Sequence, residues 1–335
     1  ARYGGISLSF EVSRAVRPSL PSMATTWFST LWRSSLFLLS RPAAGCPPGT
    51  VPWPDEPCQP IANATTESTA FLRANMFKFD EPNAATLFDG GIVEPTGKLA
   101  LVARKKFGWA GKVPRDIFES AVLPYASVNE ARTDWRQLLW DSLTSLEWVT
   151  ALPADSSLEA VAFAVNAHVW ADLGALTGRK AVVFKSEQTP LIYDPLSTIL
   201  FGYASCTGIS LAYVDSLRTL GVPARLVGTP AWHGKPSDGN HNWVEVWLSE
   251  EEGWRFIEGA PAGAGETFTN PCDKWFCNPA HFPKANGTDE GATKVFATTY
   301  SKVGSTVYPM AWDLANKDVA GVDRSAYYNE VCGAC

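Results

Sequence analysis

The sequence predicts an α+β fold in which a helix packs on an antiparallel sheet, with a helical region before them in the chain. Three patterns within residues 202–261 favour this fold. Apolar residues at three- and four-residue spacing predict a helix over 206–220. Alternating side chains over 241–248 and over 254–258 predict two strands, and the short charged turn between them makes these strands antiparallel.

The predicted helix carries Cys206 in its first turn. Ser205 or Thr207 can cap this end. Gly221 and Pro223 end the helix, because glycine adopts the left-handed conformation there and proline cannot continue a helix. Unpaired amides and the helix dipole favour an anion in the first turn. We therefore expect a lowered pKa for the Cys206 thiol and a larger share of the nucleophilic thiolate.

The two predicted strands carry an imidazole and a carboxylate. His241 opens the first strand, and Glu258 closes the second. If Leu248 pairs with Trp254, Glu258 faces away from His241, whereas a shift of one residue or a bulge puts both on one face. Together with Cys206, the two residues would form a nucleophile, a base and an orienting acid.

These residues lie in motifs that resemble the transglutaminase-like superfamily. The motifs are ASCTG, LGVPAR, GNHNWVEVW, and a GW pair four residues before an acid, and they are most similar to a microbial branch. The superfamily has a papain-like layout and a Cys-His-Asp triad. The resemblance implies Cys206 as the nucleophile, His241 as the base and Glu258 as the third member, although Glu258 stands where Asp is usual. It covers roughly residues 68–328.

Three further residues are candidates for substrate binding. The LPYASVNE segment also resembles this branch, and its Tyr125 and Asn129 could reach the cleft. The favoured alternative is that they cap neighbouring helices. Trp232, a few residues before His241, is a candidate for lining the acyl site.

Other histidines and acids compete for the same roles. His233, the competing base, lies in a loop with Gly, Pro and Lys and is expected to be exposed. His281 lies in a Pro-flanked loop without a visible partner. His168 lies beside the apolar stripe of a helix, where a structural role is expected. Glu245 is a mid-strand charge between two tryptophans, and we expect it to pair with Arg225. A lone cysteine at a helix start is usually a small buried hydrophobe, but the histidine strand that follows favours catalysis here.

Composition divides the chain into four segments. We expect a disordered leader and Pro-rich linker over 1–66, a helical region over 67–150, a catalytic core over 151–265 and an extension with cysteine pairs over 266–335. Residues 23–45 have a weak signal-peptide pattern, because Arg33 interrupts their apolar run.

Periodicity predicts elements outside the central stretch as well. We expect short helices over 69–79 and 115–121, a helix of about five turns that includes Trp135 and Leu146, a helix after a capping box of Ser156 and Glu159, a buried strand over 181–186, and a strand over 294–300.

The seven cysteines divide into Cys206 and three close pairs. The pairs predict the disulfides Cys46–Cys58, Cys272–Cys277 and Cys332–Cys335. A structural zinc site made by the four late cysteines is the alternative. The sequons at Asn63 and Asn286 fit a secretory route. Secreted or extracytoplasmic location is therefore favoured, with a cytoplasmic or organellar location as the alternative.

Charge and hydropathy limit the classes of partner that the protein is expected to have. The net charge of −6, with no basic cluster in the core, argues against nucleic acid. No apolar run approaches the ~20 residues of a membrane span. We expect a peptide or protein substrate and neither a cofactor nor a catalytic metal, while the sequence indicates no oligomeric state.

The expected chemistry is acyl transfer through a thioester. Cys206 attacks an amide carbonyl, its backbone N–H helps to hold the oxyanion, and His241 protonates the leaving amine. Hydrolysis is favoured over Gln–Lys crosslinking, because the acidic Ca²⁺ loops of large crosslinking enzymes are not seen. A non-catalytic module that binds a peptide or glycan is the third hypothesis.

Overall fold

Six antiparallel strands form the main sheet, in the order β7-β6-β5-β8-β10-β9. The strands are β5 (Ala224–Thr229), β6 (His241–Trp247), β7 (Trp254–Ile257), β8 (Phe296–Thr298), β9 (Thr306–Val307) and β10 (Ala320–Asp323). The computed structural model describes residues 46–54, 56–189, 191–263, 267–283 and 291–335. The predicted signal-like segment lies outside these residues.

Alternation along the strands gives the sheet two apolar faces. On one face Val244 belongs to the main hydrophobic core, and α9 (Cys206–Thr219) packs against β5 and β6. On the other face Trp243 and Phe256 form a second cluster with residues of α10 (Ser325–Gly333). Both faces are therefore covered, which explains why every residue of β5 and β6 is buried.

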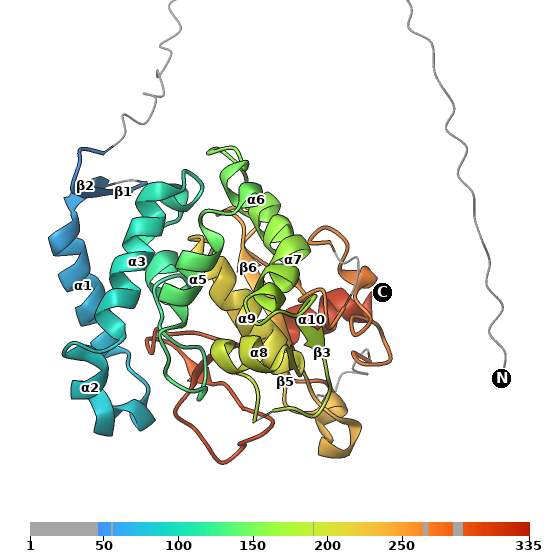
Figure 1. The fold of residues 1–335 in the computed structure, drawn as a ribbon. Coiled ribbons are helices and arrows are strands. Elements are labelled where there is room, and N and C mark those ends of the chain that lie inside the picture. Colours follow the sequence, from blue (N-terminus) through green and yellow to red (C-terminus); the bar gives the residue numbers. More distant parts are fainter. Residues whose placement is uncertain (1–45, 55, 190, 264–266, 284–290) are drawn as a thin grey trace, which may run out of the picture. The chain divides into compact units, whose positions relative to one another are not determined.

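The central helix is α9, which contacts α3, α5, α7 and α8 (Figure 1). Every residue of α9 after Cys206 is buried, so the helix lies inside the core and shows more than the single apolar stripe that its spacing predicts. Gly221 follows it with φ +77°, as expected for its C-terminal stop. The other α-helices are α1 (Ile61–Ala74), α2 (Ala84–Phe88), α3 (Val93–Lys106), α4 (Arg115–Ala121), α5 (Trp135–Leu143), α6 (Glu147–Thr150), α7 (Leu158–Ala175) and α8 (Pro195–Phe201).

Short 3₁₀ turns connect these elements. They are η1 (Lys78–Asn83), η2 (Ala110–Lys112), η3 (Trp232–Gly234), η4 (Pro236–Asp238) and η5 (Pro271–Asp273).

The expectation of disorder up to residue 66 is wrong for its described part. A hairpin of β1 (Thr50–Trp53) and β2 (Glu56–Pro60) precedes α1, which begins inside the predicted linker (Figure 1). The disulfide Cys46–Cys58, the predicted pairing, closes this hairpin. Its strands contact α1 and α3, so tertiary packing outweighs the coil preference of the prolines.

Several predicted boundaries also need correction. The helix of about five turns is divided into α5 and α6, because Leu146 is extended and starts the second helix as its N-cap. Ser157, and not Ser156, caps α7 by accepting from the backbone N–H of Ala160. The predicted buried strand is only β3 (Val183–Phe184), which is exposed and pairs in parallel with β4 (Tyr203–Ala204).

The predicted boundary at residue 265 does not separate two domains. Residues 45–335 form one compact unit, in which the C-terminal extension supplies β8, β9 and β10 to the same sheet as β6. Among the residues that the structure describes, no helix is both long and apolar enough to cross a bilayer.

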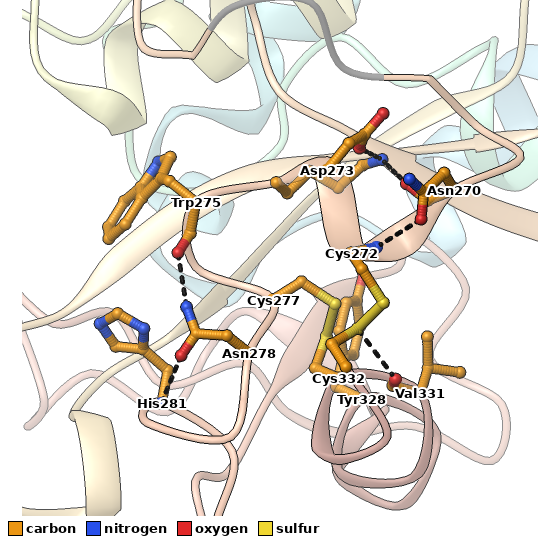
Figure 2. Close-up of a disulfide and its surroundings, with 12 residues drawn as sticks. Asn270, Cys272, Asp273, Trp275, Cys277, Asn278, His281, Tyr328, Val331 and Cys332 are labelled. Carbon is orange, nitrogen blue, oxygen red and sulfur yellow. Dashed lines mark hydrogen bonds and ion pairs between the residues drawn. A yellow bond between two sulfur atoms is a disulfide. The ribbon is translucent and has the colours of Figure 1, made fainter.

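The four late cysteines pair across two segments, and not within them as predicted. Cys272 bonds Cys335, and Cys277 bonds Cys332 (Figure 2). Cys332 and Cys335 lie three residues apart at the end of α10, so both sulfurs face the same neighbouring loop. All four thiols are consumed in these bonds, which removes the alternative of a four-thiolate zinc site.

Candidate active site

Cys206 is the first residue of α9, as predicted, and its side chain is half-buried with a free thiol. Ser205 is the N-cap residue, but its hydroxyl does not cap the helix and instead hydrogen-bonds the hydroxyl of Thr189. The backbone amides of the first helical turn therefore keep their positive end toward the thiol.

The glycine of the ASCTG motif brings this helix start close to a neighbouring loop. A Cβ on Gly208 would lie 2.5 Å from the Cβ of Ala204 and 2.9 Å from the carbonyl oxygen of Ile192. Only a residue without a side chain fits between these groups, so Gly208 fixes the depth at which Cys206 sits.

Glu258 lies on the face of His241. Trp247 pairs with Trp254 and Val244 with Ile257, so the next residue, Glu258, is level with Trp243. The register with Leu248 opposite Trp254 is thereby excluded. His241 Nε2 and Glu258 Oε1 are 2.5 Å apart, and Glu258 is completely buried.

The Cys206 thiol lies beside the His241 ring and interacts with it. Because Nε2 contacts Glu258, the nitrogen left for the thiol is Nδ1. Burial opposes ionisation of the thiol, but the hydrogen bond and charge of His241, aided by the backbone N–H of Asn242, outweigh it and lower the pKa of Cys206. Burial likewise opposes protonation of the imidazole, but its bonds to Cys206 and Glu258 raise the pKa of His241 to about 9. Both shifts favour a thiolate–imidazolium pair over a neutral thiol and imidazole.

Asn242 joins the helix start to the strand. Its Oδ1 accepts from the Thr207 hydroxyl at 3.0 Å, and its carbonyl oxygen accepts from the Ser210 hydroxyl at 3.3 Å. Its Nδ2 donates to the Tyr308 hydroxyl at 2.5 Å. These bonds tie the first turn of α9 to the beginning of β6 and thereby set the distance between thiol and imidazole.

Two residues that the sequence analysis did not select hold Glu258. Trp275 Nε1 donates to Glu258 Oε2 at 2.9 Å. Asn166 Nδ2 donates to the Glu258 carbonyl oxygen at 2.9 Å, and Asn166 Oδ1 accepts from the Ala260 amide at 2.8 Å. Asn166 had a signal in the sequence, since it is a polar residue in the apolar face of its helix, whereas Trp275 had none beyond its place between two cysteines.

Cys206 and His241 open into a cavity of about 790 Å³. Aromatic side chains form much of its wall, and Glu187 is the carboxylate among its lining residues. The lining residues are Phe184, Ser186, Glu187, Thr189, Ser205, Cys206, Thr207, Gly239, Asn240, His241, Ala262, Trp275, Ala311 and Trp312. The cavity can take a peptide-sized group with its carbonyl at the thiol.

The predicted substrate-binding residues do not line this cavity. Tyr125 is buried in an aromatic cluster, where its hydroxyl donates to Asp80 at 2.8 Å. Trp232 is buried behind His241 and stacks on Trp243. Tyr125 and Trp232 are therefore packed in the interior of the protein and are not exposed to the cavity.

Asn129 lies one layer behind the cavity wall. Its Oδ1 accepts from Trp312 Nε1 at 3.0 Å and from the Tyr193 hydroxyl at the same distance. It therefore orients Trp312, a lining residue, and is neither a helix cap nor itself part of the wall.

The competing residues lie elsewhere. Glu245 accepts from Arg225, as predicted, and also from Arg324. His233, expected to be exposed, is half-buried and contacts Asp238 at 2.8 Å. His281, expected to lack a partner, packs against Trp232 with ring centres 4.5 Å apart. His168 is exposed and stacks on Trp148.

The described residues contain no group of three or more His, Cys, Asp or Glu side chains placed to hold a metal ion. Of the two sequons, Asn63 is exposed on α1, while Asn286 lies outside the described residues.

Comparisons with known proteins agree with the motifs. Residues 175–258, which include Cys206, His241 and Glu258, match the family described as the transglutaminase-like superfamily. The resemblance seen in the motifs is confirmed over this segment, and so is the fold class, with a helix that begins at the cysteine and packs on an antiparallel sheet.

Two solved structures are similar to the chain at 14% identity. A proposed cysteine protease from Cytophaga hutchinsonii has a TM-score of 0.27, with 42% of this chain and 43% of that chain covered. Red sea bream transglutaminase has a TM-score of 0.26, with 48% and 30% covered. The chain thus spans less than half the length of either protein. No curated protein matches it.

Proposed function

We propose that this chain, with its transglutaminase-like segment at 175–258, is a cysteine enzyme that cleaves amide bonds of peptides or proteins through a thioester. The observation that carries the proposal is the line of contacts from the Cys206 thiol through the His241 ring to the Glu258 carboxylate, at the wall of a cavity. A half-buried thiol with a lowered pKa beside a histidine with a raised pKa is typical of a catalytic nucleophile.

The reaction begins with attack of the Cys206 thiolate on the substrate carbonyl carbon. The oxyanion forms next to the helix start, where the Cys206 backbone N–H and the helix dipole stabilise its charge. His241, already protonated, gives its proton from Nδ1 to the leaving amine, and the C–N bond breaks. Glu258 holds the ring and its positive charge through Nε2.

Water then resolves the thioester in the first version of the proposal. His241, now neutral, takes a proton from the water, the hydroxide adds to the carbonyl, and the thiolate leaves. The products are a carboxylic acid and the free enzyme. The chain is then a hydrolase, an amidase or peptidase.

A primary amine resolves the thioester in the second version, which makes the chain an acyltransferase that crosslinks Gln to Lys. Glu187 favours this version, because an exposed carboxylate on the cavity wall attracts a cationic amine. A non-catalytic module that binds a peptide or glycan in the same cavity is the third candidate.

We propose that the protein is secreted or otherwise extracytoplasmic. Three disulfides are present among the described residues, and disulfides persist in oxidising compartments. The exposed Asn63 sequon suits a glycoprotein.

A competition assay tests the proposal. Wild-type protein and Cys206→Ala are incubated with a Gln-containing peptide library, with and without a fluorescent primary amine, and products are identified by mass. Acid products that require Cys206 support hydrolysis, and amine adducts support acyl transfer. A protein whose thiol reacts with iodoacetamide but which forms neither product would be a binding module.

A further inference from the structure

Trp275 contacts two of the three proposed catalytic groups from the solvent side. Its Nε1 donates to Glu258 Oε2 at 2.9 Å, and its ring centre lies 4.8 Å from that of His241. Glu258 has no exposed surface, whereas Trp275 is 49% exposed and lines the cavity.

The indole N–H of Trp275 supplies a hydrogen-bond donor to the second carboxylate oxygen of Glu258. Oε1 faces His241 Nε2, and Oε2 accepts from Trp275. A buried carboxylate oxygen without a donor is costly, and a carboxylate held at only one oxygen can turn about its last side-chain bond. With both oxygens held, the plane of the carboxylate is set and Oε1 stays directed at the imidazole.

Two disulfides hold the loop that carries Trp275. The residue lies between Cys272 and Cys277, which are bonded to Cys335 and Cys332 at the end of α10. Figure 2 shows its ring projecting away from both disulfides.

Hydrogen bonds fix the same loop further. The neighbouring Lys274 is buried, and its Nζ donates to the carbonyl oxygens of Thr267 and Asn270. The Trp275 carbonyl oxygen accepts from Asn278 Nδ2 at 2.6 Å. The loop is therefore rigid on both sides of the tryptophan, which is what a residue that positions another requires.

We propose that Trp275 is a positioning residue, which acts through Glu258 on His241, and that the two disulfides anchor it. This inference rests on the proposed function, because it assigns Trp275 a part in the same site. Loss of the indole N–H loosens Glu258 and weakens its bond to the imidazolium. The pKa of the Cys206 thiol then moves up toward its ordinary value, since the thiolate depends on the charged ring.

Other titratable groups near Cys206 and His241 do not produce this shift in the pKa of the thiol. Tyr308 faces Cys206, and burial raises the pKa of its hydroxyl far above the usual range. His281 packs against Trp232 and Trp275, and burial lowers the pKa of its ring. Both are thus uncharged at neutral pH. Glu187 lines the cavity but has no part in the bonds among Cys206, His241 and Glu258.

The test is the rate of Cys206 alkylation by iodoacetamide as a function of pH, followed by peptide mass. This measurement needs no substrate and reports thiolate directly. Trp275→Phe keeps the ring beside His241 and removes the N–H. We expect a midpoint about 0.5–1 pH unit higher and a rate at neutral pH about three- to tenfold lower. Trp275→His, whose ring carries an N–H, recovers part of the loss.

Trp148→Phe is the matched control. Trp148 Nε1 donates to Asp172 Oδ2 at the same 2.9 Å, outside the site, so this variant loses an equivalent bond. We expect its alkylation profile to equal that of wild type. A wild-type profile for a folded Trp275→Phe, or an equal shift in Trp148→Phe, would overturn the inference.

If Trp275→Phe does not fold, a second variant tests the same inference. Cys272→Ser with Cys335→Ser opens one anchor and retains the tryptophan, and the same upward shift of the midpoint is expected. An unchanged midpoint would show that the disulfide does not anchor Trp275, and it would overturn the inference. A shifted midpoint in a protein that turns over no substrate would instead overturn the proposed function and leave the positioning of Cys206 by Trp275 standing.

Discussion

Trp247 lies opposite Trp254 in the β6–β7 ladder, and this one pairing decides the geometry of the site. It carries Glu258 to the face of the sheet that holds His241, where Oε1 reaches Nε2 at 2.5 Å. A ladder shifted by one residue would turn the carboxylate to the opposite face and leave the imidazole without a partner.

Cys206→Ala is expected to remove turnover of any amide substrate. Loss of the nucleophile in such triads costs several orders of magnitude, roughly 10³-fold or more. The thiol is half-buried and its replacement is small, so the melting temperature should change little. Single-turnover and steady-state assays with thermal unfolding as the control measure this, and wild-type activity in the variant would refute the enzyme assignment.

The pH dependence of kcat/KM should be bell-shaped, and its alkaline limb should lie at a higher pH than an ordinary histidine would give. Activity rises as the Cys206 thiol ionises, below its ordinary range, because the charged ring stabilises the thiolate. It falls as His241 loses its proton, near pH 9, because the leaving amine can then no longer be protonated. An alkaline limb near 6.5, the ordinary value for histidine, would contradict the ion pair.

Replacing His241 should cost more activity than replacing Glu258. His241→Ala removes the proton donor and is expected to lower kcat by roughly 10⁴-fold, whereas Glu258→Ala removes its support and is expected to cost roughly 10²-fold. Glu258→Gln, which keeps an acceptor for Trp275, is the matched control for stability. Equal losses of kcat in the two alanine variants would show that the carboxylate does more than orient the ring.

Glu245 should govern stability without affecting the thiol. Its carboxylate is fully buried and accepts from Arg225, Arg324 and Tyr328. Glu245→Ala leaves the buried guanidinium of Arg225 and the half-buried one of Arg324 without this carboxylate, so the free energy of unfolding in urea should fall by about 3–5 kcal/mol. The pH profile of Cys206 alkylation is expected to stay at its wild-type position, and a shift there would mean that the two networks are coupled.

Non-reducing peptide mapping should recover two cross-linked pairs. Cys332 and Cys335 stay on one peptide, so fragmentation of the cross-linked species should assign Cys272 to Cys335 and Cys277 to Cys332. Pairs within each segment would mean that the loop of Trp275 is not bonded to α10.

Local pattern was sufficient to place Cys206 and His241, the proposed nucleophile and base. The helix of Cys206 and the strand of His241 have their own periodicity and stop signals, and the structure has both where the patterns predict them. The capping residue of α7 was displaced by one position, because two adjacent serines offer the same chemistry.

The remaining parts of the site depend on contacts between distant segments. The register is set by the pairing of β6 with β7, whereas the bonds of Cys277 to Cys332 and of Trp275 to Glu258 join segments that lie apart in the sequence. Tyr125 was misassigned for the same reason, since its motif resembles a cleft segment while packing draws it into an aromatic cluster.

The disulfides to Cys332 and Cys335 have a consequence for biosynthesis. A ribosome delivers Cys206 and His241 well before it delivers the residues that tether Trp275. The nascent chain therefore holds Cys206 and His241 before the loop of Trp275 can be tethered, and the tether forms only when Cys332 and Cys335 have been made and oxidised.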